Sequence, residues 1–118
     1  MLAVGEYALG EVDERTQRMT TGFSGGVGDE CRYLCGAFSA GVMIIGALYG
    51  RTQPEVDETM CYVKVRQYRD RFEGKLGSVT CSELRAEKYG SGGREPCSVL
   101  VERAAKILLE VLDEENTR

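Results

Sequence analysis

The sequence predicts an all-α protein, a compact bundle of about five helices around a buried helix that is rich in glycine and alanine. Apolar residues recur at helical spacing in several segments, and no segment alternates apolar and polar residues as a strand does. Glycine-rich stretches separate these segments, which is typical of loops between helices. A chain of 118 residues has the size of one domain with one core, so we expect a single helical cysteine-rich domain over residues 1–118.

The first two predicted helices are short. One covers residues 2–9 and ends at Gly10, a common residue type just past a helix end. No N-cap residue precedes this helix, which favours an N-terminal helix that has been truncated. The second helix covers residues 14–21, with Asp13 as its N-cap. Residues 22–28 follow, and they contain too much glycine for regular structure.

The third predicted helix covers residues 30–49, with Asp29 as its N-cap and Gly50 at its end. It holds seven small residues, namely Gly36, Ala37, Ser39, Ala40, Gly41, Gly46 and Ala47. Glycine inside a helix costs about 0.5–1 kcal/mol relative to alanine, so its repeated use indicates that another backbone packs very close. The remaining residues are apolar on every side, as in a fully buried helix. We expect this to be the central helix of the domain or of a dimer.

The fourth predicted helix covers residues 54–72. Pro54 suits the first turn of a helix, and the acidic Glu55 favours its positive end. Its apolar stripe consists of Cys61, Val65, Tyr68 and Phe72. Gly77 ends the segment.

Two further helices complete the prediction. Thr80 and Glu83 match a capping box, which predicts a short helix over residues 81–88. After another glycine-rich loop, Pro96 opens the last helix, over residues 97–113. Its apolar stripe consists of Leu100, Ala104, Ile107, Leu108 and Val111.

The composition excludes several classes of function. The chain has five cysteines and no histidine. It therefore cannot build by itself a Ser-His-Asp or Cys-His catalytic group, a Cys/His zinc finger or a histidine-ligated haem. The net charge of −4 argues against nucleic acid as a partner, because such proteins carry a basic face.

The chain shows no signal-peptide pattern and no transmembrane pattern. Residues 34–50 are uncharged but include four glycines, and they fall short of the ~18 apolar residues of a bilayer span. We therefore expect a cytoplasmic protein with no membrane partner. The cytosol keeps thiols reduced, so cysteines there more often bind metals or do redox chemistry than form a disulfide framework.

Four of the five cysteines fall in or near predicted helix N-termini. They are Cys31, Cys35, Cys81 and Cys97. The positive end of a helix stabilises the thiolate, which is the form that ligates metals and attacks disulfides. Cys61 differs, because it lies in the middle of the apolar stripe of the fourth helix and is expected to be a small core residue.

These thiols allow two kinds of redox site. Cys31, Cys35, Cys81 and Cys97 could ligate an iron–sulfur cluster or another metal, since thiolates alone suffice for such a centre. Thiol–disulfide exchange would instead use one helix-start cysteine as the attacking thiol and another as the resolving thiol. The rival interpretation is a non-catalytic helical oligomer, with the Gly/Ala-rich helix as a dimer contact and the thiols as structural residues.

Glycines near the thiols are candidate contacts for a cofactor. Gly26 and Gly28 lie in the loop before Cys31, and Gly36 follows Cys35. Glycine lets a backbone or a bound group approach closely. The loop begins like a dinucleotide fingerprint but lacks its third glycine and a preceding strand, so we do not expect a dinucleotide.

Five ordered segments of the chain resemble a known family. They are residues 25–28, 35–41, 46–51, 72–81 and the pair Pro96-Cys97 before an alanine-rich amphipathic helix. In these segments the chain resembles the C_GCAxxG_C_C family of redox-active, cysteine-rich proteins. That family is similar to the cysteine-bearing part of split-Soret cytochromes.

The resemblance implies a role for each matched cysteine. Cys35 corresponds to the core cysteine of the family pattern, and Cys81 and Cys97 correspond to the two later ones. The first cysteine of the pattern has no counterpart here, and Cys31 is its candidate substitute, an auxiliary thiol. The resemblance implies redox or electron-transfer activity with a redox partner protein, and it implies an iron–sulfur or other metal centre on these thiols. The chain has no C-x-x-C-H motif, so it attaches no c-type haem.

Overall fold

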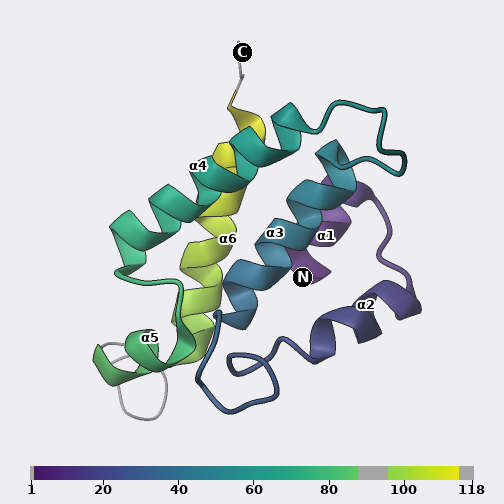
Figure 1. The fold of residues 1–118 in the computed structure, drawn as a ribbon. Coiled ribbons are helices and arrows are strands. Elements are labelled where there is room, and N and C mark those ends of the chain that lie inside the picture. The colour runs from purple at the N-terminus through teal and green to yellow at the C-terminus, as the bar shows by residue number, and fades with distance from the viewer. Residues whose placement is uncertain (1, 88–95, 115–118) are drawn as a thin grey trace.

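Six helices make up the part of the chain that this computed structural model describes, residues 2–87 and 96–114 (Figure 1). They are α1 (Leu2–Leu9), α2 (Glu14–Thr21), α3 (Gly36–Tyr49), α4 (Thr59–Leu76), α5 (Cys81–Glu87) and α6 (Cys97–Asp113). Within those residues the only β pairing is an isolated antiparallel bridge between Leu34 and Thr80. The all-α prediction is confirmed, with six helices in place of about five. No helix in the described ranges is long and apolar enough to cross a bilayer.

Helices α3, α4 and α6 pack against one another, and α1 packs against α3 and α6 (Figure 1). The rings of Phe38, Tyr68 and Phe72 lie between α3 and α4, with their centroids 5.3–5.7 Å apart. One pair is stacked and two are edge-to-face, and each such contact adds about 0.5–1.5 kcal/mol to what burial alone contributes. This aromatic cluster fixes α3 against α4.

The Tyr68 ring explains one of the glycines in α3. A Cβ atom added at Gly41 would lie 2.5 Å from carbon atoms of that ring, so no larger residue fits. The expected close approach is real at this position, but a side chain makes it and not a second backbone. Gly46 has no atom within 4 Å of such a Cβ.

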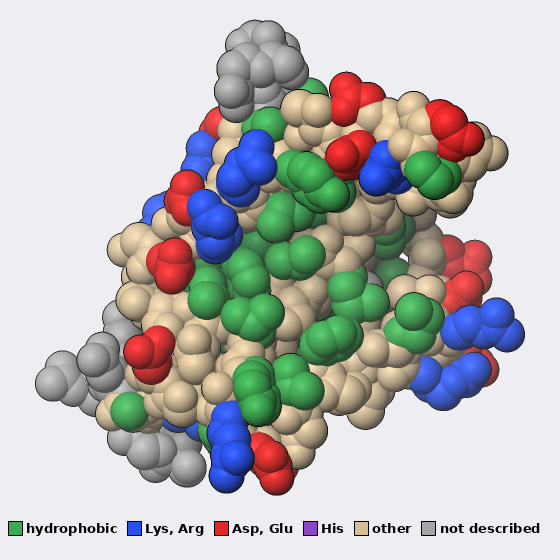
Figure 2. All heavy atoms as spheres, in the orientation of Figure 1, with side chains coloured by type: hydrophobic (Ala, Val, Ile, Leu, Met, Phe, Trp, Pro, Cys, Tyr) green, Lys and Arg blue, Asp and Glu red, His purple; other side chains and the backbone are tan. Residues whose placement is uncertain are grey.

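The sequence predicted a third helix that is buried on every side, but the C-terminal end of α3 is partly exposed. Ala47 is exposed and Leu48 is 40% exposed. Figure 2 shows hydrophobic side chains gathered over the middle of this face of the molecule, with charged side chains mostly at its edges. A dimer contact through α3 stays a prediction.

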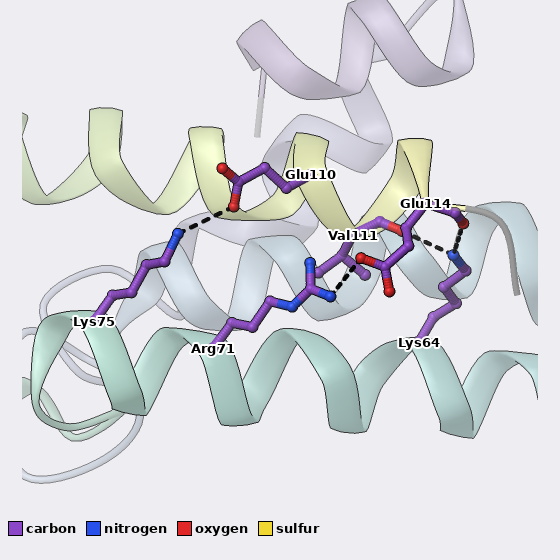
Figure 3. Close-up of polar contacts among 6 residues, drawn as sticks. All are labelled: Lys64, Arg71, Lys75, Glu110, Val111 and Glu114. Atoms are coloured by element: carbon purple, nitrogen blue, oxygen red, sulfur yellow. Dashed lines mark hydrogen bonds and ion pairs between the residues drawn. The ribbon is translucent and has the colours of Figure 1, made fainter.

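Three cations of α4 reach across to the C-terminal half of α6 (Figure 3). Lys64 is buried, and its Nζ donates to the carbonyl oxygens of Val111 at 2.8 Å and Glu114 at 2.7 Å. These are carbonyls at the end of α6, which have no partner inside the helix, so Lys64 caps α6. Arg71 pairs with the carboxylate of Glu114, and Lys75 pairs with Glu110 at 3.2 Å.

The start of the third helix differs from its prediction. The helix begins at Gly36 and not at residue 30, and Cys35 is its N-cap in place of Asp29. Asp29 and Cys31 both have left-handed backbone conformations, with φ of +60° and +62°. Such a conformation cannot continue an α-helix, so residues 22–35 form a loop.

The fourth and fifth helices also differ in part. Helix α4 begins at Thr59 and not at Pro54, because Asp57 Oδ1 accepts hydrogen bonds from both the backbone N–H and the hydroxyl of Thr59. The helix continues past residue 72 to Leu76 and ends, as predicted, at Gly77 in the left-handed conformation.

The predicted capping box at α5 does not form. Glu83 accepts a hydrogen bond from the Ser78 hydroxyl at 2.6 Å, and that hydroxyl accepts one from the Thr80 N–H at 3.0 Å. The predicted end of the helix at Lys88 lies outside the described residues.

The bounds of α1, α2 and α6 agree with the sequence prediction. Asp13 caps α2 as expected, since its Oδ1 accepts from the Thr16 N–H at 2.7 Å. Pro96 is the N-cap of α6.

Candidate functional site: a cluster of four cysteines

Four of the five cysteines gather at one end of the helices, where α3, α5 and α6 begin (Figure 1). Cys35, Cys81 and Cys97 line one cavity of about 300 Å³. Cys31 lies beside them and accepts a hydrogen bond from Arg85 Nη1 at 2.9 Å. All four have free thiols. We call these residues the four-cysteine cluster. Cys61 lies apart from it on α4, half-buried against the hydrophobic core.

The isolated β-bridge brings Cys35 and Cys81 together. The Cys35 N–H donates to the carbonyl of Val79 at 2.7 Å, and the Cys81 N–H donates to the carbonyl of Tyr33 at 2.9 Å. Each cysteine directly follows the bridged residue of its own segment and lies at the start of a helix. In antiparallel pairing these two positions are diagonal neighbours on one side of the ladder, so both side chains face the same cavity.

Glycine in the loop before α3 lets Cys31 reach this pair. Gly26 is buried with φ of +81°, and a Cβ atom there would lie 2.6 Å from Cys81 Cβ and 3.0 Å from Cys31 Cα. Cys81 Cβ and Cys31 Cα are therefore at most 5.6 Å apart, the sum of 2.6 and 3.0 Å. Of the other glycines expected to contact a cofactor, Gly36 lines the cavity, while Gly28 has no atom within 4 Å of an added Cβ.

Burial decides the protonation of the two innermost thiols. It is the largest cause that raises the pKa of Cys81 from 9.0 to about 11, followed by the hydrogen bond to Cys31 and the charge of that residue. Burial also raises the pKa of Cys35, and it outweighs the backbone N–H groups of Phe38 and Ala37 at the start of α3. The stabilising effect expected of a helix start is present at Cys35, but burial outweighs it, and the raised pKa values keep Cys35 and Cys81 protonated at neutral pH.

Arg85 is the residue of this site that the sequence analysis missed. The neighbouring sulfurs of Cys31 first and Cys81 second raise the pKa of its guanidinium, and a hydrogen bond to Cys97 adds to this. It is the one charged residue among those that line the cavity in the described part of the chain. Its position four residues after Cys81 was the available signal, since residues at this spacing share a helix face.

The arrangement does not match a site for one metal ion. Within residues 2–87 and 96–114, no group of three or more Cys, Asp or Glu side chains is placed to hold one. The predicted joint ligation of a single ion by Cys31, Cys35, Cys81 and Cys97 therefore does not fit these positions. An iron–sulfur centre on these thiols stays a prediction.

Comparison with protein families matches residues 1–111 to the family described as "Putative redox-active protein (C_GCAxxG_C_C)". Neither the comparison with curated proteins nor that with solved structures gives a match. The family match covers most of the chain and all five cysteines. The chain therefore belongs to the C_GCAxxG_C_C family of redox-active proteins.

Proposed function

We propose that this protein is a thiol redox protein in which Cys31 and Cys81 convert reversibly between two thiols and a disulfide. The observation that carries the proposal is the close approach of both residues to Gly26, where an added Cβ would lie 2.6 Å from Cys81 Cβ and 3.0 Å from Cys31 Cα. Disulfides join residues whose Cα atoms are usually 4.4–6.8 Å apart, and two backbones that approach one glycine this closely are near that range.

The two thiols differ in a way that suits an attacking and a resolving role. Cys31 is half-buried, so a substrate can reach its sulfur, and Arg85 donates to that sulfur and holds it in place. Cys81 is only 6% exposed and holds its proton at neutral pH. Cys31 is therefore the attacking thiol and Cys81 the resolving thiol.

The reaction balances as a two-electron exchange with a substrate disulfide. Cys31 Sγ attacks one substrate sulfur, the substrate S–S bond breaks, and one half leaves as a thiolate that takes up a proton. Cys81 then loses its proton and attacks Cys31 Sγ, which releases the second half as a thiol. The protein ends as a Cys31–Cys81 disulfide, and the substrate has gained two electrons and two protons.

Equilibration in glutathione buffers of graded potential, followed by mass spectrometry of peptides, tests this proposal. We expect a Cys31–Cys81 disulfide that appears in one two-electron transition. Cys31→Ser and Cys81→Ser should each abolish the transition, and Cys61→Ser should leave it unchanged. A disulfide between other cysteines, or full reduction under all conditions, would overturn the proposal.

A second candidate is an iron–sulfur protein, and the cavity that Cys35, Cys81 and Cys97 line favours it. These three residues with Cys31 would hold the cluster, which would supply one-electron transfer. Anaerobic purification with iron and sulfide analysis and absorption spectroscopy tests this function. Iron that is lost in Cys35→Ser and kept in Cys61→Ser would support it, and a colourless, iron-free protein after reconstitution would exclude it.

A further inference from the structure

The cavity beside the thiols has one charged residue and otherwise neutral walls. Arg85 is that residue, and the apolar walls come from Leu84, Leu100 and Val101. Thr20 and Ser24 supply the hydroxyls. No carboxylate lines the cavity within the described part of the chain, so its electrostatic potential is set mainly by a cation.

Arg85 has hydrogen-bonding capacity left over for a ligand. Its Nη1 donates to Cys31, and its side chain also bonds Cys97. A guanidinium carries five N–H donors, and these two contacts leave others on a side chain that lines the cavity. An anion is the best acceptor for a guanidinium, and a carboxylate matches its planar geometry.

We propose that the cavity holds the carboxylate of a small anionic disulfide and that Arg85 selects this substrate. The inference rests on the thiol–disulfide function proposed above. Arg85 touches Cys31 and lines the cavity, so a carboxylate held there would bring the substrate sulfur towards the attacking thiol. The aliphatic part of the substrate would contact Leu84, Leu100 and Val101. A volume of about 300 Å³ is at the lower end for ligand pockets, which favours a small molecule over a protein loop.

Three small disulfides of opposite and zero charge test the proposal. They are 3,3′-dithiodipropionate (two carboxylates), bis(2-hydroxyethyl) disulfide (neutral) and cystamine (two ammonium groups). For each variant, the rate of thiol–disulfide exchange between the reduced protein and each disulfide is measured with a reductant in excess. The rate with dithiodipropionate is then divided by the rate with cystamine. This ratio cancels any change in the reactivity of Cys31 or in the folded fraction, which affects all three substrates alike. A role of Arg85 confined to positioning Cys31 would leave the ratio unchanged.

We expect Arg85→Gln to lower the ratio about tenfold or more, the range for a hydrogen bond to a charged group. Arg85→Lys, which keeps the charge, should retain part of the preference. Arg66→Gln removes a charge from an exposed position on α4 and is the matched control, with an unchanged ratio expected.

The outcomes separate this inference from the function on which it rests. Exchange with all three disulfides at a ratio that Arg85→Gln leaves unchanged would overturn the selection by Arg85 and leave the thiol–disulfide function standing. An equal fall of the ratio in Arg66→Gln would also overturn it, because net charge would then explain the preference. Exchange with none of the three would refute the proposed function itself.

Discussion

Replacement of Gly26 by alanine tests whether the loop before α3 must approach the four-cysteine cluster as closely as described. The left-handed conformation at φ +81° costs a non-glycine residue about 1–2 kcal/mol. The new Cβ would lie 2.6 Å from Cys81 Cβ, whereas carbon atoms normally pack at 3.5–4.0 Å. The loop must therefore move by about 1 Å, and overpacking of this kind costs a further ~1–3 kcal/mol.

Gly28→Ala is the matched control for this substitution. Gly28 has φ of +72° but no atom within 4 Å of an added Cβ, so it carries the backbone cost alone. In urea unfolding we expect Gly28→Ala to lower the free energy of unfolding by about 1–2 kcal/mol, and Gly26→Ala to lower it by about 2–5 kcal/mol.

The same two variants should differ in thiol chemistry. The movement forced by Gly26→Ala separates Cys31 from Cys81, so less Cys31–Cys81 disulfide should form in glutathione buffer. Gly28→Ala should form as much as the unchanged protein. Equal stability and equal disulfide formation in the two variants would refute the reasoning from the Gly26 contact.

Three further predictions follow from the fold and the pKa shifts. In urea unfolding, Gly41→Ala should lower the free energy of unfolding by about 1–3 kcal/mol, because its new Cβ meets the Tyr68 ring. Gly46→Ala should raise it by about 0.5–1 kcal/mol, because that helix position has open space for a Cβ. The opposite order of stabilities would contradict the packing of α3 against Tyr68. Lys64→Met should lower the midpoint of urea unfolding by the equivalent of about 2–3 kcal/mol through loss of the α6 cap, against almost no change for the exposed Lys106→Met. Alkylation of Cys81 should stay slow at pH 8 and accelerate towards pH 11. Because folding raises the pKa of Cys81 from 9.0, its contribution to stability should be complete below pH 9 and be lost as the pH rises towards 11. An alkylation rate that is half-maximal near pH 9 and level above it would contradict the raised pKa.

Local signals in the sequence were sufficient for some helices and insufficient for others. Asp13 and Pro96 mark the starts of α2 and α6 by capping rules that depend only on neighbouring residues, and both predictions are confirmed. The start of α3 depends on a distant contact, the pairing of Leu34 with Thr80, which no local pattern reveals. At the start of α4 the proline signal of Pro54 competes with Asp57, which accepts from the N–H of Thr59 two residues later, and the helix begins at Thr59.

The candidate site was predictable by residue type and less so by chemical state. The position of Cys35, Cys81 and Cys97 near helix starts is readable from the sequence, and the structure places all three there. Their burial is a property of the assembled fold, and it raises the pKa of Cys35 and Cys81 to a degree that no local pattern in the sequence reveals. Arg85 lies four residues after Cys81 on the predicted short helix, but only the folded chain brings it against Cys31.

The pairing of Leu34 with Thr80 has a consequence for how the protein is made. During synthesis Cys31 and Cys35 leave the ribosome well before Cys81, because α3 and α4 lie between them in the chain. Thr80, which pairs with Leu34, is also made only after both helices. Until then, Cys31 and Cys35 can meet only each other among these thiols. Closing the long loop between Leu34 and Thr80 also costs conformational entropy, which only the contacts of the folded chain offset. Premature oxidation would thus trap the adjacent pair. The proposed pairing of Cys31 with Cys81 therefore requires the two early thiols to stay reduced until the chain has folded.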